Sequence, residues 1–188
     1  MTMDEIKAQF ETNFFGLITT TKAVIPTMRK QRSGTIVNIS SLGGRIGLMP
    51  FLTAYHASKF AVERFTESFR QELAEFNINV ILIEPGAIRS SFIDNSKNAK
   101  NYNPQDSPYS KMIQKVFEGF ESVMGDSSSP RDVAETILNA VNTSTPNIRY
   151  PVGKDAVYAL KVTAELSDKE MENWARESYM EKKAFIRE

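Results

Sequence analysis

The chain has 188 residues, and its 23 lysines and arginines balance 23 aspartates and glutamates, so its formal net charge at pH 7 is zero. This length suits one domain with a sizeable core, and the balanced charge indicates neither a nucleic-acid partner nor an anionic membrane surface. The lack of cysteine excludes disulfides and thiol nucleophiles, and a single histidine excludes a histidine-rich metal cluster. No apolar run approaches the roughly 20 residues of a membrane span. We expect one soluble, cytoplasmic domain over residues 1–188, without a metal site.

A long helix is the first expected element, over residues 2–31. Apolar side chains recur there mostly at steps of three and four positions, and Thr2 and Glu5 can form a capping box. Pro26 lies within this stretch and is expected to kink or shorten the helix.

Two apolar segments that follow indicate buried strands. GTIVNIS is short and β-branched, and NINVILIEPG is a longer apolar run that stops at Pro85 and Gly86. Apolar side chains between them recur at helical spacing, at Val62, Phe65, Phe69, Leu73 and Phe76. Strand, helix and strand at this length predict a right-handed parallel βαβ unit.

The second half combines a long loop with further helices. Residues 87–108 are rich in Ser, Asn, Asp and Pro, and loops of this length are often functional. SPYSKMIQKVFEGFESVM predicts a helix, and SSSPRDVAETILNAVN predicts another with Ser129 as N-cap before Pro130. IRYPVG suits a last short strand, and residues 154–186 are expected to be mostly helical. We expect residues 87–127 to form a substrate loop or lid region.

Three polar side chains are expected to meet at one edge of the sheet. Ser41 ends the first strand, and Tyr55 and Lys59 lie one helical turn apart on the same face of the following helix. The functional crevice of a parallel sheet lies outside the carboxyl ends of its strands, where the turn at Pro85 and Gly86 would also lie.

The chemistry of this group follows from acidity. A nearby ammonium favours phenolate and lowers the pKa of tyrosine from about 10, so Tyr55 would become a usable general acid or base. Ser41 could hold a carbonyl or alcohol oxygen beside the phenol. No side chain can transfer hydride, so a nicotinamide cofactor would have to supply that step.

Taken together, these motifs resemble the C-terminal part of a short-chain dehydrogenase/reductase. The matching stretches are TNFFG, SGTIVNISS, YHASKFAVERFTESFRQEL and VILIEPGAIRSSF, in the family's order, over about residues 10–92. The resemblance implies an α/β fold, a partial Rossmann-like, doubly wound parallel sheet of about three strands covered by helices. The family's N-terminal strand, T-G-x-x-x-G-x-G turn and pyrophosphate-binding helix have no counterpart in this sequence. We therefore expect most of the cofactor-binding half to be missing.

The resemblance implies a role for each catalytic candidate. Tyr55 would be the acid/base, and Lys59 would bind the nicotinamide ribose hydroxyls and lower the Tyr55 pKa. Ser41 would orient the substrate, with Ser40 as a lesser candidate. Asn13 would hold a water that relays protons to the lysine.

The cofactor is expected to be NAD or NADP, without a readable preference. Pro85 and Gly86 would shape the nicotinamide pocket, the backbone of Ile88 would meet the carboxamide, and Ser90 replaces the family's usual threonine. The residues expected to bind the cofactor are Tyr55, Lys59, Pro85, Gly86, Ile88 and Ser90.

The implied activity is NAD(P)-dependent interconversion of a secondary alcohol and a ketone or aldehyde. The substrate would be a small molecule of lipophilic character, because the expected lid is rich in apolar side chains, and family members usually dimerise through the helices that bear Asn13 and Tyr55. Two alternatives are a catalytically inert fragment acting as a dimerisation or interaction module, and a non-redox enzyme that uses the same polar cluster.

Overall fold

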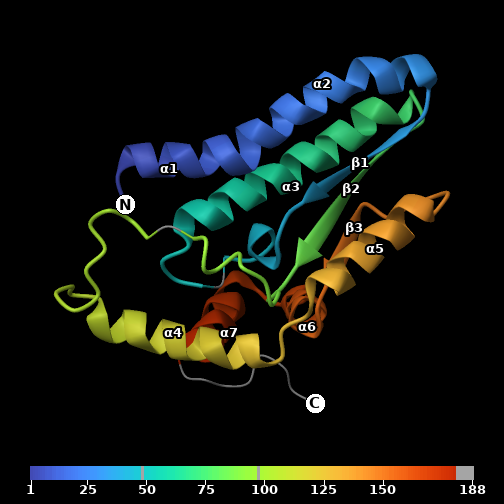
Figure 1. Cartoon of the computed structure of the whole chain (residues 1–188). Helices are drawn as coiled ribbons and strands as arrows, with labels where there is room; N and C mark the ends of the chain where they lie inside the picture. Colours follow the sequence, from blue (N-terminus) through green and yellow to red (C-terminus); the bar gives the residue numbers. More distant parts are fainter. Residues whose placement is uncertain (48, 97, 181–188) are drawn as a thin grey trace.

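Three parallel strands in the order β1, β2, β3 form the central sheet of the computed structural model, which describes residues 1–47, 49–96 and 98–180 (Figure 1). The strands are β1 (Gly34–Ile39), β2 (Ile78–Pro85) and β3 (Arg149–Val152). In the register, Gly34 pairs with Ile78, and Leu82 pairs with Arg149. The predicted parallel βαβ unit and the predicted last short strand are both confirmed.

Helices flank this sheet. Their bounds are α1 (Met3–Phe10), the π-helix η1 (Glu11–Phe15), α2 (Gly16–Gln31), the 3-10 turn η2 (Leu42–Gly44), α3 (Thr53–Ala74), α4 (Ser110–Gly125), α5 (Pro130–Asn142), α6 (Lys154–Thr163) and α7 (Asp168–Met180). Helix α3 packs on β2, α2 contacts β1, and α5 packs on β2 and β3. Figure 1 shows α2 and α3 on one side of the sheet and α5 on the other. This arrangement is the predicted α/β fold.

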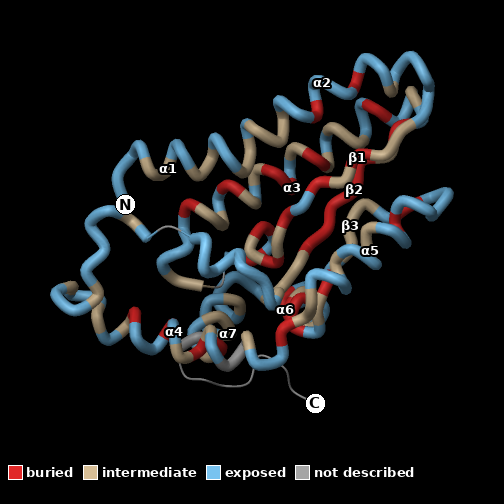
Figure 2. The backbone as a smooth tube through the Cα atoms, viewed as in Figure 1, coloured by how far each residue is buried: buried red, intermediate tan, exposed pale blue. Residues whose placement is uncertain are grey.

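The central strand β2 forms the most buried part of the core. Its run from Val80 to Ile83 is fully buried, and Figure 2 shows the buried segments gathered in the sheet and the helix stretches that face it. Apolar burial of this kind is the main stabilising contribution to the fold. One core cluster packs β1, β2 and α3 together, and a second packs the segment at Leu42 and Ile46 against α6. These two clusters therefore hold the carboxyl ends of β1 and β2 in place by packing.

The first predicted helix differs from its expectation. The Thr2 and Glu5 capping box is present, but the irregularity lies at η1 and not at Pro26, which is inside an unbroken α2. Pro26 removes one N–H from the helix ladder. The residue four positions earlier, Lys22, is exposed, so water can satisfy its carbonyl. Pro26 therefore does not shorten the helix, and a kink at this position stays a prediction.

The second half follows its predictions more closely. Ser129 caps α5 and accepts from the backbone of Asp132, with Pro130 at the first helical position. The described residues of this stretch, 87–96 and 98–108, contain no helix or named strand, although Ile88 forms an isolated bridge with Ser128. The stretch 154–186 is predicted to be mostly helical, and α6 and α7 occupy most of its described part. Residues 181–186 lie outside the described residues.

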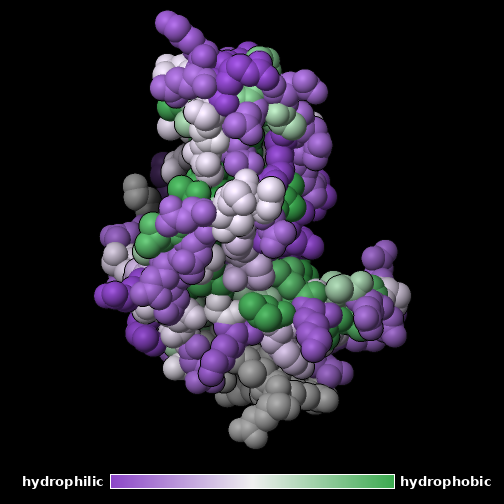
Figure 3. All heavy atoms as spheres, turned by 90° about the vertical axis from the view of Figure 1, so that its right-hand side faces the viewer, coloured by the Kyte–Doolittle hydropathy of each residue, from purple (hydrophilic) through white to green (hydrophobic). Residues whose placement is uncertain are grey.

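The outer surface is mixed in character. From the right-hand side of Figure 1, hydrophobic patches interrupt a mostly hydrophilic surface (Figure 3). Large apolar side chains are exposed on several helices, including Phe15 on η1, Phe60 on α3 and Leu138 on α5. Within the described part of the chain, no helix is both long enough and apolar enough to cross a membrane.

Candidate active site

Ser41, Tyr55 and Lys59 come together at the carboxyl end of β1. Ser41 is the N-cap of η2 and accepts a hydrogen bond from the Gly43 backbone at 3.1 Å. Its side chain also lies close enough to Tyr55, in the first turn of α3, to lower the pKa of the phenol in part. Lys59, one turn along α3, donates to the carbonyl of Ile39 at 2.9 Å. Its Nζ lies 5.9 Å from the centroid of the Tyr55 ring. A hydroxyl, a phenol and an ammonium thus share one small region.

Ser40 is placed differently from Ser41. Its backbone N–H donates to Ile83 at 2.8 Å, which continues the pairing of β1 with β2. The Ser40 hydroxyl is buried and has no hydrogen-bond partner in the described part of the chain. Of the two adjacent serines, Ser41 is therefore the one whose side chain contacts Tyr55.

Burial determines the acidity of Tyr55 and Lys59. Burial raises the pKa of the Tyr55 phenol, and the hydrogen bond from Ser41 lowers it only in part. Burial also lowers the pKa of the Lys59 ammonium, while the negative charge of Glu63 raises it. The Tyr55 pKa is therefore raised and not lowered as expected, because desolvation of the phenolate is its largest cause. Tyr55 is accordingly protonated near neutral pH.

Asn13 contacts α3 through Ser58. Its amide Nδ2 donates to the Ser58 hydroxyl at 3.0 Å, and that hydroxyl donates to the Tyr55 carbonyl at 2.7 Å. The neighbouring Phe14 contacts Phe65 edge to face, with 6.0 Å between the ring centroids. Because a π-helical turn holds an extra residue, both neighbours can face α3. Asn13 therefore connects η1 to the turn of α3 that carries Tyr55.

Pro85 and Gly86 lie at the carboxyl end of β2, beside a buried carboxylate. Gly86 donates its backbone N–H to Val152 at 2.9 Å, and Ala87 donates to Asp155 Oδ2 at 2.7 Å. A Cβ added at Gly86 would lie well under 3.0 Å from the Asp155 carboxylate. Asp155 is in the first turn of α6, so this contact fixes the end of β2 against α6.

A Gly86→Ala substitution is expected to destabilise the protein by about 1–3 kcal/mol. The methyl group would displace the Asp155 carboxylate from the Ala87 N–H, which urea unfolding at pH 7 would measure. Gly47→Ala is the control, because a Cβ there meets nothing within 4 Å. In an Asp155→Ala background the cost of Gly86→Ala should shrink, and an unchanged cost would contradict the steric explanation.

The segment after β2 returns to Tyr55. Ile88 bridges Ser128, and Ser90 accepts a hydrogen bond from the Phe92 backbone at 3.3 Å. The Phe92 ring lies 6.1 Å from the Tyr55 ring, measured between centroids. The loop that carries Ser90 is therefore adjacent to the phenol, and Phe92 forms part of its surroundings.

A second aromatic contact lies before α3. Phe51 has a positive φ of 68°, a conformation that bulky side chains rarely adopt, and its ring contacts Tyr109 with 6.1 Å between centroids. Phe51, Phe92 and Tyr109 are all substantially exposed. Phe92 and Tyr109, from the predicted lid region, thus contribute exposed aromatic rings that contact Tyr55 at the start of α3 and Phe51 just before it.

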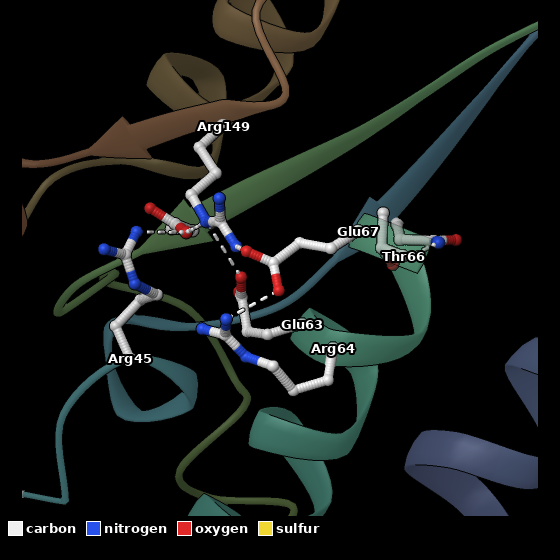
Figure 4. A network of polar contacts seen from close by, with 8 residues as sticks. Arg45, Glu63, Arg64, Thr66, Glu67 and Arg149 are labelled. Atoms are coloured by element: carbon white, nitrogen blue, oxygen red, sulfur yellow. Dashed lines mark hydrogen bonds and ion pairs between the residues drawn. The ribbon is translucent and has the colours of Figure 1, made fainter. Parts of the chain in front are cut away.

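Sequence reasoning missed a buried ion cluster, which consists of Arg45, Glu63, Glu67, Glu84 and Arg149. Arg149 Nε lies 3.2 Å from Glu63 Oε2 and 3.0 Å from Glu84 Oε1, and its Nη2 lies 2.5 Å from Glu67 Oε1. Arg45 Nη1 reaches the same Glu84 oxygen at 3.2 Å. Figure 4 shows Arg149 extending from β3 toward the carboxylates of α3, with Arg45 nearby. The cluster joins α3, β2, β3 and the segment after η2.

Two carboxylates of the buried ion cluster are fully buried, Glu63 and Glu84. Burial raises the pKa of Glu84 to about 7, with a further rise from the charge of Glu63, against the lowering effect of Arg45 and Arg149. A partial signal for this cluster was available, because Glu63 follows Lys59 at one-turn spacing on a predicted helix. Its arginine partners could not be found from that spacing.

The described residues contain no group of three or more His, Cys, Asp or Glu side chains arranged to hold a metal ion. The polar groups near Tyr55 are instead hydroxyl, ammonium and backbone groups. This donor set suits proton transfer and hydrogen bonding to an oxygen atom.

The chain is similar to known dehydrogenases and oxidoreductases in both sequence and fold. The sequence model of the short chain dehydrogenase family matches residues 1–101. An uncharacterized oxidoreductase, YusZ of Bacillus subtilis, is 38% identical over 97% of the chain, and a 3-ketodihydrosphingosine reductase of Bacteroides thetaiotaomicron is 38% identical over 81%. The crystal structure of a short-chain dehydrogenase from Streptomyces avermitilis covers 94% of the chain with a TM-score of 0.73 and 30% identity.

The chain is shorter than these similar proteins. It spans 64% of the Bacillus oxidoreductase, 56% of the Bacteroides reductase and 62% of the Streptomyces chain. The similarity therefore concerns the part of each protein that corresponds to these 188 residues.

Proposed function

The chain belongs to the short-chain dehydrogenase family, and on this premise we propose that it carries the proton-transfer site of an NAD(P)-dependent oxidoreductase. The proposed reaction interconverts a secondary alcohol and a ketone or aldehyde. The observation that best supports it is the proximity of the Ser41 hydroxyl and the Lys59 ammonium to the Tyr55 phenol. Such a trio can hold a substrate oxygen and exchange a proton with it.

The donor set around Lys59 fits the ribose of a nicotinamide nucleotide. An ammonium has three N–H donors, and one of them is used by the Ile39 carbonyl at 2.9 Å. The remaining donors can bind ribose hydroxyls. The bound cofactor would supply or accept the hydride, which no amino-acid side chain can do. Either NAD or NADP would serve this chemistry.

In the reduction direction, Tyr55 donates its hydroxyl proton to the carbonyl oxygen of the substrate. Burial keeps this proton on the phenol near neutral pH, because it raises the Tyr55 pKa. The Ser41 hydroxyl donates a hydrogen bond to the same substrate oxygen, and the positive charge of Lys59 stabilises the phenolate that remains. In the oxidation direction, the phenolate takes the proton back from the alcohol.

Further residues are proposed to support this site. Asn13 orients the first turn of α3 through Ser58, and it holds the water that passes protons toward Lys59. Pro85 and Gly86 would border the nicotinamide at the end of β2. The Ile88 backbone and the Ser90 hydroxyl would bind the nicotinamide side of the cofactor.

The substrate is proposed to be a small lipophilic alcohol or carbonyl compound. The Phe92 ring lies beside Tyr55. The exposed ring of Phe51, just before α3, contacts the exposed ring of Tyr109, just before α4. Such rings can cover an apolar ligand. Residues 87–127 would then act as the substrate loop or lid.

Titration of residues 1–188 with NADH and NADPH, followed by nicotinamide fluorescence, tests the proposal. Saturable binding is expected, and Lys59→Ala should raise the dissociation constant about tenfold or more, since it removes the ribose donor. Tyr55→Phe should keep the binding and lose carbonyl reduction. A folded chain that binds neither nucleotide would contradict the proposal for this polypeptide.

A second candidate function is self-association without catalysis. The helices that bear Asn13 and Tyr55 leave large apolar side chains exposed, among them Phe15 at 49% and Phe60 at 51%. Exposed side chains of this size suit a dimer interface. Sedimentation equilibrium distinguishes the two functions, because a stable dimer that binds no nicotinamide favours the interaction module.

A further inference from the structure

Lys59 must remain positively charged in a position where burial opposes the charge. Its ammonium donates to the Ile39 carbonyl and lies beside the uncharged Tyr55 ring. A carbonyl contributes only a partial negative charge. The full negative charge that acts on Lys59 comes from Glu63, which raises the Lys59 pKa against the lowering by burial.

Glu63 is built into the fold at a position from which it can act on Lys59. The two residues lie four positions apart on α3, so their side chains project from the same face of the helix. Glu63 is fully buried, and Arg149 binds only its Oε2. Its Oε1 is buried without a hydrogen-bond partner in the described part of the chain. A buried carboxylate with one unpaired oxygen calls for an explanation beyond packing.

We propose that Glu63 is a positioning residue for the proposed reaction, whose buried carboxylate stabilises the Lys59 ammonium from the next turn of α3 while Arg149 fixes that carboxylate in place. The catalytic meaning of this inference rests on the proposed function. The electrostatic interaction between Glu63 and Lys59 requires no cofactor, so it is measured on the chain alone.

The other charged groups around Glu63 determine how the test is arranged. Arg149 faces it from β3, Glu84 from β2 and Glu67 from the next turn of α3, and Arg45 pairs with Glu84. Glu84 is the group that titrates near neutral pH, with a pKa of about 7. A titration above pH 8 therefore reports on Lys59 after Glu84 has lost its proton.

The experiment is a titration of Lys59 by NMR in the chain labelled with ¹³C at the lysine ε-carbon, with the Lys59 signal assigned by its loss in Lys59→Arg. In Glu63→Gln, the proton affinity of Lys59 is expected to fall about tenfold, which is a pKa about 1 lower. Glu63→Asp keeps the charge at a shorter reach and should give a smaller fall.

Glu67→Gln is the matched control. It removes a carboxylate from the same helix and the same Arg149, but at a position one turn farther from Lys59. It should leave the Lys59 pKa nearly unchanged. The inference would be overturned if the Lys59 pKa fell equally in Glu63→Gln and Glu67→Gln, or if it fell in neither variant. If Glu63→Gln does not fold, an unchanged Lys59 pKa in folded Glu63→Asp would overturn it as well.

This result and the nicotinamide titration can fail separately. If the Lys59 pKa responds to Glu63 but the chain binds no nucleotide, the electrostatic interaction is supported and the oxidoreductase proposal is contradicted. If the chain binds nucleotide but the Lys59 pKa does not respond to Glu63, the oxidoreductase proposal is supported and Glu63 is not its positioning residue.

Discussion

Replacing Arg149 with methionine is expected to lower the free energy of unfolding by about 3–5 kcal/mol at pH 7. The substitution keeps much of the side-chain volume but leaves Glu63, Glu67 and Glu84 without the cation that contacts all three. Two of these carboxylates are fully buried, so water cannot replace the arginine. Urea unfolding, followed by circular dichroism, measures the loss.

Two variants serve as controls for Arg149→Met. Arg149→Lys keeps the charge but not the planar guanidinium fork that contacts three carboxylates at once, and its stability loss should be smaller. Arg131→Met breaks the exposed pair with Glu135, whose side chains are 85% and 58% exposed, and should change stability by less than about 1 kcal/mol. An Arg149→Met loss no larger than that of Arg131→Met would show that the buried ion cluster contributes little to stability.

The second large effect concerns pH. Burial raises the Glu84 pKa from 4.5 to about 7, so the folded state holds this proton more tightly than the unfolded state does. The stabilising contribution of that proton is complete below about pH 4.5 and is lost as the pH rises through about 7. A rise of this size corresponds to about 3 kcal/mol. Glu84→Gln cannot ionise and therefore lacks this loss.

The measurement compares the free energy of unfolding of the wild type and Glu84→Gln between pH 5 and pH 8. From pH 5 to pH 8, the free energy of unfolding of the variant should rise relative to that of the wild type by on the order of 3 kcal/mol, because only the wild type loses the Glu84 proton there. In the variant, Arg149 keeps Glu63 and Glu67 as partners. Glu135→Gln, an exposed site, should give a curve parallel to that of the wild type. If the stability of Glu84→Gln varied with pH in parallel with that of the wild type, Glu84 would not be the group that holds a proton near neutral pH.

Much of the fold could be predicted because its signals are local. The β-branched and apolar runs indicated β1 and β2, and Ser129 before Pro130 indicated the start of α5. The π-helix η1 gives no such signal. One additional residue in a single turn hardly changes an apolar repeat that is averaged over a long helix. The backbone of the structure reveals it, and Asn13 and Phe14 within it both contact α3.

The site could be predicted in part, for a similar reason. The proximity of Ser41, Tyr55 and Lys59 follows from strand order and helical spacing. The direction of the Tyr55 pKa does not, because it depends on burial, which comes from tertiary packing. The buried ion cluster depends on the register of β3, which places Arg149 opposite Leu82, two residues from Glu84. Sequence spacing alone does not give that register.

The position of Arg149 on β3 also has a consequence for the order of folding. Asn38 and Thr66, which are hydrogen-bonded within the β1, α3 and β2 unit, are 28 positions apart, whereas Arg149 and Glu63 are 86 positions apart. Closing the longer loop costs more chain entropy, so the β1, α3 and β2 unit can form before β3 joins it. We expect the buried ion cluster to form after the rate-limiting step. Its loss would then accelerate unfolding and leave the folding rate almost unchanged.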